Sequence, residues 1–86
     1  MNDYSVTFAR SARKELEALE IPYVERIVVR IEALMRDPRP RDCKKLQGEE
    51  NLWRIRIGNY RVVYAICDEK RVVDIIAVRH RRDIYR

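Results

Sequence analysis

The side chains best suited to chemistry in this chain are three arginines that lie close together in residues 51–67, NLWRIRIGNYRVVYAIC. They are Arg54, Arg56 and Arg61. A guanidinium group binds phosphate oxygens through paired hydrogen bonds, so a cluster of arginines is typical of an anion site. The plainer alternative is a solvated sheet face on which arginine stems cover apolar surface.

Two runs of alternating residues flank Gly58-Asn59, and this pattern predicts a β-hairpin with a two-residue turn. The predicted register pairs Ile57 with Tyr60, Arg56 with Arg61, Ile55 with Val62 and Trp53 with Tyr64. Because side chains alternate along a strand, one face is an apolar core face, and the other carries the arginines. The core face consists of Trp53, Ile55, Ile57, Tyr60, Val62, Tyr64 and Ile66. Like charges directly opposite each other destabilise a hairpin, and neither run contains Asp or Glu, so the arginine face needs an explanation.

The excess positive charge lies entirely in the second part of the chain. Residues 1–50 carry ten Lys/Arg and ten Asp/Glu, whereas residues 51–86 carry nine Lys/Arg against four Asp/Glu. This asymmetry favours a polyanionic partner, most commonly nucleic acid, although an acidic protein or a membrane surface would also satisfy it.

Length and composition are typical of a folded protein, with 47% apolar and 38% charged residues, and we expect one domain spanning residues 1–86. No apolar run approaches the ~20 residues of a membrane helix. The first residues lack the basic and then apolar order of a secretion signal. Two isolated cysteines, Cys43 and Cys67, are too few for a metal site or a disulfide framework, so we expect no metal and a cytoplasmic setting.

Elements on both sides of the hairpin must position it. Residues 4–8 alternate as a short strand, and Ser11 can cap a helix that runs to about Leu19. Pro22 suits the start of a second helix, which Asp37-Pro38 ends. The apolar residues of the two helices recur at helical spacing and are expected to face inward: Ala12, Leu16, Leu19, Val24, Ile27, Val28, Ile31, Leu34 and Met35. Residues 71–78 are apolar on both faces and predict an interior strand.

Two basic segments remain. The connector 39–50 contains Lys44 and Lys45, which belong either to a solvated loop or to a ligand contact. The ending, residues 79–86, is either a frayed basic tail or a segment docked through Ile84-Tyr85. The pattern leaves open whether Arg79 and Arg81, or instead His80, lie on the Arg61 face. The expected fold is therefore α+β, in the order βααβββ, with a mostly antiparallel four-stranded sheet and a two-helix hairpin packed on one face.

The sequence resembles the RelE/ParE superfamily of bacterial toxins over nearly the whole chain, and specifically its RelE side. Three segments carry the resemblance: Lys45-Leu46-x-Gly48, residues 52–64 (LWRIRIGNYRVVY) and residues 80–85 (HRRDIY). The resemblance implies the toxin of a type II toxin–antitoxin pair with the RelE-like, microbial RNase-like fold. Many such toxins enter the ribosomal A site and cut mRNA there by attack of a ribose 2′-oxygen on the adjacent phosphate, without a metal or another cofactor.

The resemblance also implies roles for single residues. Arg61 corresponds to the arginine that stabilises the phosphorane-like transition state, and Arg81 to the arginine that protonates the leaving 5′-oxygen. Tyr85 corresponds to a tyrosine that orients the substrate, and an aromatic ring there can stack on a base. RNA-binding residues are expected at Arg54, Arg56, Arg79, Arg82, Lys44 and Lys45.

Arg54 and Arg56 occupy the places of two lysines in the best-studied member of the family. Arginine is essentially never deprotonated, so these residues supply charge but are poor general bases. Histidine has an unperturbed pKa of about 6.5, which suits proton transfer at neutral pH. His80 is therefore the candidate base or acid, although as the only histidine it can equally be a structural residue at a strand end.

The partners implied are a RelB-like antitoxin, with an acidic segment that wraps the toxin, and the ribosomal A site with its mRNA. We expect no membrane partner, and DNA contact only through the antitoxin. Two alternatives stay open: a ParE-like protein that inhibits DNA gyrase by binding, and a catalytically weak toxin that acts through its antitoxin complex.

Overall fold

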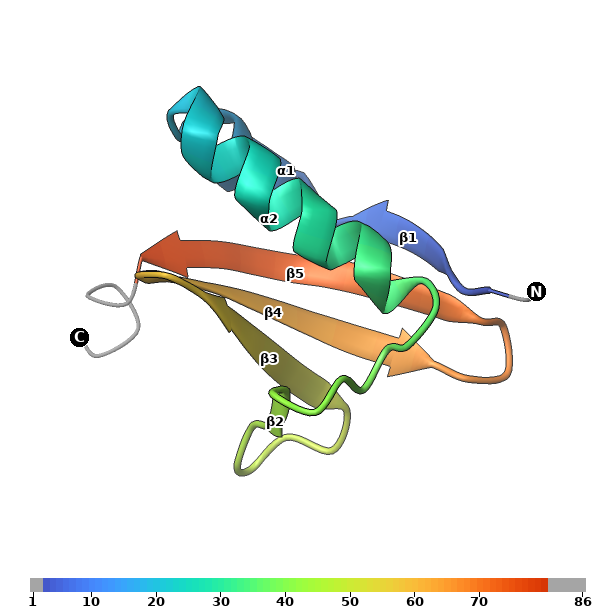
Figure 1. Ribbon diagram of the computed structural model, residues 1–86. Coiled ribbons are helices and arrows are strands. Elements are labelled where there is room, and N and C mark those ends of the chain that lie inside the picture. Colours follow the sequence, from blue (N-terminus) through green and yellow to red (C-terminus); the bar gives the residue numbers. More distant parts are fainter. Residues whose placement is uncertain (1–2, 81–86) are drawn as a thin grey trace.

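The computed structural model describes residues 3–80, which form two helices and a five-stranded mixed sheet (Figure 1). In chain order the elements are β1 (Ser5–Phe8), α1 (Arg10–Glu17), α2 (Ile21–Leu34), β2 (Lys44–Lys45), β3 (Leu52–Ile57), β4 (Tyr60–Cys67) and β5 (Val72–His80). The strand order in the sheet is β1-β5-β4-β3-β2, with β1 parallel to β5 and the other pairs antiparallel. The predicted α+β class and mostly antiparallel sheet are confirmed.

The predicted number of four strands is wrong, because the connector contains the short strand β2. Its residues Lys44 and Lys45 pair with Arg54 and Trp53 at the outer edge of β3. The sequence of two adjacent lysines lacks the alternation of apolar and polar residues that predicts a strand. Lysine on a short edge strand also discourages pairing with another chain.

The hairpin of β3 and β4 has the predicted register. Ile57 pairs with Tyr60 and Arg56 pairs with Arg61, so the loop is the dipeptide Gly58-Asn59. Gly58 has φ +60°, a conformation that residues with a Cβ rarely adopt, and this explains glycine at the first position of the turn.

Strand β5 lies between β1 and β4, as its apolar pattern predicted. Asp74, the one acidic residue within it, accepts a hydrogen bond from Thr7 of β1 (Oγ1–Oδ1, 2.8 Å). Beyond the end of β1, the exposed edge of β5 meets α1, and the Val78 N–H donates to the Glu15 carboxylate (2.9 Å). This contact satisfies a backbone donor that no neighbouring strand reaches.

The core contains residues from both helices and from one face of the sheet. Its buried residues are Ala12, Leu16, Ile27, Ile31, Leu34, Ile55, Ile57, Val62, Tyr64, Ile66, Val73, Ile75 and Val78. Trp53 and Tyr60 are partly buried and pack against this cluster. Full burial of one such aliphatic side chain stabilises the fold by about 1.5–3 kcal/mol. The predicted apolar face of the hairpin is thus confirmed as a core face.

The helices are held by their apolar faces rather than by side-chain caps. Helix α1 begins at Arg10, and its N-cap Ala9 makes no side-chain cap hydrogen bond, so the predicted capping role of Ser11 is wrong. Pro22 lies in the first turn of α2, where a missing N–H costs nothing.

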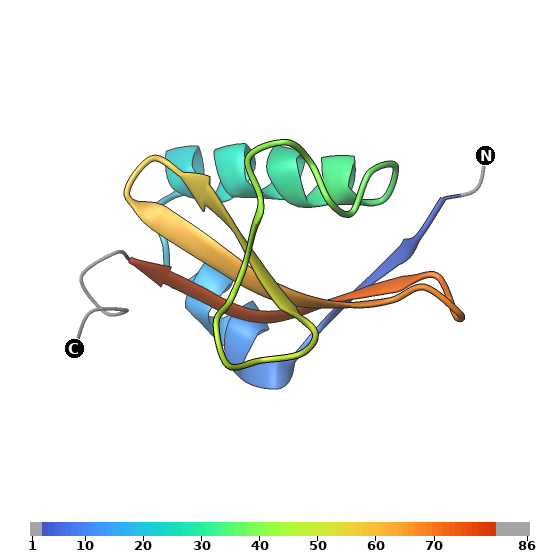
Figure 2. The same cartoon turned by 90° about the horizontal axis from the view of Figure 1, so that it is seen from below.

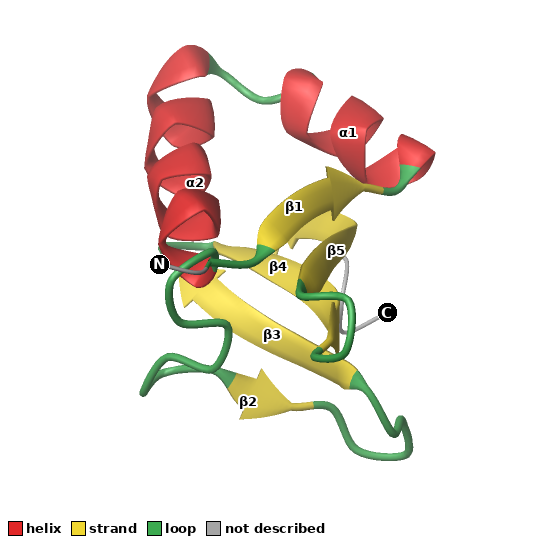
Figure 3. Ribbon diagram, turned by 90° about the vertical axis from the view of Figure 1, so that its right-hand side faces the viewer, coloured by secondary structure: helices red, strands yellow, loops and turns green. Residues whose placement is uncertain are grey.

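The two helices contact the sheet at different places. Helix α2 forms a layer over the sheet (Figure 2), whereas α1 lies beside β1 and β5 (Figure 3). No helix among residues 3–80 is long and apolar enough to cross a membrane.

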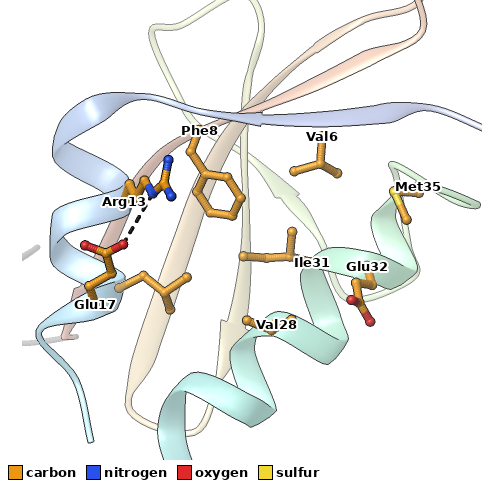
Figure 4. A pocket seen from close by; sticks show the side chains of 9 residues that line it. Val6, Phe8, Arg13, Glu17, Val28, Ile31, Glu32 and Met35 are labelled. Carbon is orange, nitrogen blue, oxygen red and sulfur yellow. Dashed lines mark hydrogen bonds and ion pairs between the residues drawn. The ribbon is translucent and has the colours of Figure 1, made fainter. Parts of the chain in front are cut away.

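An apolar groove of about 550 Å³ separates the helices, and the Val6 and Phe8 side chains of β1 point into it (Figure 4). Its walls are formed by Arg13, Leu16, Glu17, Val28, Ile31, Glu32 and Met35.

Candidate nucleic-acid interface

Three arginines form a row across the three central strands of the sheet. Arg56 of β3 pairs with Arg61 of β4, and Arg61 pairs with Arg79 of β5. Directly opposed residues of neighbouring strands present their side chains on the same face, with Cβ atoms about 4.5–5.5 Å apart. The structure therefore brings Arg56, Arg61 and Arg79 together.

A second row extends the positive surface. Lys44 of β2 pairs with Arg54 of β3, and Arg54 lies two residues from Arg56 and so on the same face. The neighbours of Arg54 further along the row are the uncharged residues Val63 and Ala77. We call this surface the basic face of the sheet, and it consists of Lys44, Arg54, Arg56, Arg61 and Arg79.

A one-residue irregularity in β5 brings Arg79 to this face. The pairing of β4 with β5 shifts between Val63 and Tyr64: Tyr64 pairs with Ile75 and Val63 pairs with Ala77, so Ile76 is extra. The buried positions of β5 shift by one residue at the same place. Val73 and Ile75 are buried before the extra residue, and Val78 is buried after it. Bulges of this kind re-aim side chains and are frequent beside functional sites.

The arginines of the row differ in exposure. Arg61 is only 3% exposed, whereas Arg56 and Arg79 are exposed. Water screens the charge of a buried side chain less than that of an exposed one, so an anion at a given distance interacts more strongly with a charge at Arg61 than with its exposed neighbours. Arg61 is therefore the charge of the basic face that water screens least.

The protein's own carboxylates neutralise part of this charge. Arg79 Nε forms an ion pair with Glu15 Oε2 of α1 at 2.7 Å. Within residues 3–80, the ion pairs that the structure records include neither Arg54 nor Arg56. The basic face thus retains positive charge on its β3 side.

Helix α2 contributes basic residues beside Arg56. Arg30 Nη1 donates to the Arg56 carbonyl (3.4 Å), and Arg30 Nη2 pairs with Asp42 Oδ2 (2.7 Å). The Arg30 guanidinium lowers the pKa of the Asp42 carboxyl through this hydrogen bond. A groove of about 480 Å³ lies between α2 and the C-terminal end of β3, and it is lined by Arg26, Arg30 and Arg56 among others.

His80 lies on the other face of the sheet from Arg61. It pairs with Tyr60, and the two rings are edge-on with centroids 5.2 Å apart and an interplanar angle of 87°. The structure does not bring His80 into the arginine row. The question that the sequence left open is answered for residues 79 and 80: Arg79 joins Arg61, and His80 does not.

Lys45 is likewise on the core side, with Nζ 5.9 Å from the centroid of the Trp53 ring. Arg39 covers the same ring at 5.1 Å and forms two hydrogen bonds to the Asp68 carboxylate (3.3 and 3.0 Å). The Arg39 guanidinium is the main cause that lowers the pKa of Asp68, and a hydrogen bond from Tyr4 adds to it. This cluster ties the connector to the sheet and lies away from the basic face. The predicted site residues Arg81, Arg82 and Tyr85 lie outside the described residues.

Sequence reasoning missed Glu15, Arg26 and Arg30. On α2 the signal was a polar stripe at helical spacing, residues 23, 26 and 30, but that helix was interpreted only through its apolar face. Glu15 had no signal in the sequence, because its contact with Arg79 depends on where α1 meets the edge of β5.

Comparison with known proteins identifies the class to which this fold and site belong. The family of the ParE toxin of type II toxin–antitoxin systems, parDE, matches residues 6–85. The chain belongs to the RelE/ParE superfamily and is a toxin of a type II toxin–antitoxin system.

Several of the similar proteins are named RelE-type toxins. The chain is 40% identical to toxin RelG of Mycobacterium tuberculosis, with 96% of this chain and 97% of that protein covered. It is 31% identical to the mRNA interferase toxin RelE of Escherichia coli, over 95% of this chain and 90% of that protein. The RelE–RelB complex of the archaeon Pyrococcus horikoshii contains a chain that matches with TM-score 0.80 and 30% identity, covering 91% of this chain and 94% of that one. The predicted RelE-like character is confirmed.

Proposed function

We propose that this toxin is an mRNA endonuclease that acts on translating ribosomes in the cytoplasm and binds the scissile phosphodiester on its basic face. The observation that carries the proposal is the row of Arg56, Arg61 and Arg79, with the buried Arg61 at its centre. The name of the Escherichia coli relative, an mRNA interferase, supports the same activity.

The chemistry is an in-line transfer at phosphorus. The ribose 2′-oxygen forms a bond to the adjacent phosphorus as the bond to the 5′-oxygen breaks, which yields a 2′,3′-cyclic phosphate and a 5′-hydroxyl. The 2′-hydroxyl proton must leave, and the 5′-oxygen must gain one. Negative charge accumulates on the equatorial oxygens, and positive groups held in place there stabilise the transition state.

Arg61 is proposed to bind the equatorial oxygens, with Arg56 and Arg54 contributing charge from β3. Arg81 and Tyr85 are proposed, from the family resemblance alone, to protonate the leaving oxygen and to orient the substrate. Proton transfer by His80 stays a prediction, which its position beside Tyr60 does not favour.

The test uses purified protein and ribosomes programmed with a defined mRNA. Parent protein should cut the mRNA in the A site, whereas Arg61→Ala should cut it orders of magnitude more slowly with the fold intact. Equal cutting by parent and variant would contradict the assignment of Arg61. Intact mRNA with the parent itself would contradict the nuclease proposal.

The family that matches this chain is that of the ParE toxin. A ParE-like inhibitor of DNA gyrase is therefore the second candidate function. A DNA supercoiling assay with purified gyrase separates the two. The basic face favours the nuclease, and we expect gyrase to be unaffected by an excess of this protein.

The partner is proposed to be a RelB-like antitoxin, consistent with the RelE–RelB complex among the similar structures. The groove between α1 and α2 suits an amphipathic antitoxin helix, since its floor is apolar and its rim carries Arg13, Glu17 and Glu32 (Figure 4). An acidic antitoxin segment would cover the basic face. A stable complex would bury at least about 1,200–2,000 Å².

Phe8 on the floor of this groove is 38% exposed, so Phe8→Asp should weaken the complex with the protein encoded by the neighbouring gene. Ile21→Asp, at an exposed position outside the groove, is the matched control. Co-purification from co-expressing cells measures the difference. An unchanged yield of complex with Phe8→Asp would place the antitoxin elsewhere.

A further inference from the structure

A second concave surface lies around the β3–β4 turn, on the α2 side of the sheet. It is a cup of about 210 Å³. Its lining is Tyr23, Arg26, Ile27, Ile57, Gly58, Asn59 and Tyr60. The antitoxin groove shares no lining residue with this cup. The cup combines aromatic rings with Arg26, which also lies beside Arg56 in the candidate interface.

The aromatic wall of the cup is fixed in place. The rings of Tyr23 and Tyr60 have centroids 5.3 Å apart and an interplanar angle of 54°, and His80 packs edge-on against Tyr60. Tyr60 is half-buried, whereas Tyr23 is 39% exposed. A large aromatic ring that is both supported and exposed is a platform on which a planar group can stack.

Arg26 supplies the charge. It lies three residues after Tyr23 and thus on the same side of α2. One of its terminal nitrogens is 3.6 Å from the place where a Cβ on Gly58 would be, so the guanidinium lies over the turn. Among the ion pairs recorded for residues 3–80, none includes Arg26.

The cup is continuous with the basic face. Arg26 and Gly58 also line the groove at the β3 edge, and the same groove is lined by Arg56, which belongs to the basic face. A polyanion that follows the arginine row past Arg56 would enter this groove, which carries Arg26 and Arg30 together with Glu25, and would reach the Tyr23 ring of the cup from there. Alternation of cations with stacking rings is how proteins bind single-stranded nucleic acid.

We propose that this cup binds one unpaired RNA nucleotide, with its base stacked on Tyr23 and its phosphate bound by Arg26. The inference rests on the proposed function, because it extends the path of the RNA beyond the scissile phosphodiester. The nucleotide belongs either to the strand that is cut or to the RNA of the ribosome, and both offer the same base and phosphate chemistry.

Equilibrium binding to two probes tests the cup. The first probe is a fluorescent 12-nucleotide RNA with 2′-O-methyl groups throughout, which lacks the attacking hydroxyl, and the second is vacant ribosomes. Tyr23→Ala should weaken binding roughly 5- to 150-fold, since that is the contribution of one stacked base. Tyr23→Phe should bind like the parent because it keeps the ring, and Ile21→Ala, a neighbouring exposed residue of α2, should also be unchanged.

Salt dependence tests the phosphate contact. Arg26→Gln should reduce the slope of log K against log salt by about 0.7, the value for one phosphate contact on a single strand. Arg36→Gln removes the same charge just beyond the C-terminal end of α2, outside the cup, and should leave the slope at the parent value.

The outcomes separate the sources and the proposals. A loss on the oligonucleotide assigns the nucleotide to the cut strand, and a loss confined to ribosomes assigns it to ribosomal RNA. If the parent binds RNA and cuts mRNA while Tyr23→Ala and Arg26→Gln match it on both probes, the cup proposal is overturned and the nuclease proposal stands. Weakened antitoxin binding with unchanged RNA binding would make the cup a protein interface and would also overturn it. A parent that neither binds RNA nor cuts mRNA would overturn both proposals.

Discussion

Burial distinguishes Arg61 from Arg56, and the alanine variants of these two residues should differ accordingly. Arg61 is 3% exposed, and Arg56, its cross-strand partner, is exposed. A unit charge 4 Å from another interacts by about 4 kcal/mol at an effective dielectric constant of 20, and by about 1 kcal/mol in bulk water. At 1.36 kcal/mol per tenfold in rate, Arg61→Ala should slow cleavage roughly a thousandfold and Arg56→Ala roughly fivefold.

The assay is single-turnover cleavage of a defined mRNA on programmed ribosomes, followed by primer extension. Toxin is present in excess over ribosomes, so that weakened binding does not mask the chemical step. Arg61→Lys keeps the charge but loses the planar pair of donors, and its rate should fall between those of parent and alanine variant. Circular dichroism and urea unfolding verify that each variant is folded.

Cleavage by Arg61→Ala within tenfold of the parent rate would refute a dominant role for the Arg61 charge. Slower cleavage by Arg56→Ala than by Arg61→Ala would refute it as well, because the charge that water screens less should have the larger effect.

Three further predictions concern stability and proton transfer. The buried Tyr64 hydroxyl donates a hydrogen bond to the Pro38 carbonyl (2.8 Å). Tyr64→Phe removes this donor and should lower the free energy of unfolding, measured by urea titration, by about 1–3 kcal/mol. An unchanged urea midpoint would show that the hydrogen bond does not stabilise the fold. The Arg39 hydrogen bond lowers the pKa of Asp68, so this carboxylate stabilises the fold above the ordinary aspartate pKa of about 3.9, and its contribution is lost as the pH falls through the lower native value. Asp68→Asn should therefore be less stable than the parent at pH 7 but not at the lowest pH values, and equal loss at both would contradict the ion pair. His80→Gln should keep the parent's dependence of cleavage rate on pH between about 5 and 8, because the imidazole lies on the Tyr60 face; loss of that dependence would assign proton transfer to His80 after all.

The hairpin could be predicted from the sequence because two local signals agree there. Alternation specifies which residues share a face, and Gly58-Asn59 specifies which residues are opposite each other. Together they predicted that Arg56 faces Arg61, and the structure has that pair. The interior position of β5 followed from its apolar residues on both faces.

The remainder of the site depends on contacts that no local pattern encodes. The extra residue Ile76 reverses the alternation of β5 and turns Arg79, rather than His80, toward Arg61. Without that bulge, strict alternation counted from Ile75 would have put Arg79 on the core face and His80 on the face of Arg61. The ion pair of Glu15 with Arg79 arises only when α1 meets the edge of β5, and such a contact joins residues that are far apart in sequence.

The most direct test of the proposed mechanism is to block one ribose 2′-hydroxyl and measure cleavage of the adjacent phosphodiester. Parent protein is added separately to ribosomes programmed with each of two mRNAs. The two mRNAs differ only by a 2′-O-methyl group on the nucleotide before the cut. We expect new 5′ ends in the A-site codon of the unmodified mRNA and none at that position in the modified one. Equal cleavage of both mRNAs would contradict attack by the 2′-oxygen on a phosphate held at Arg61.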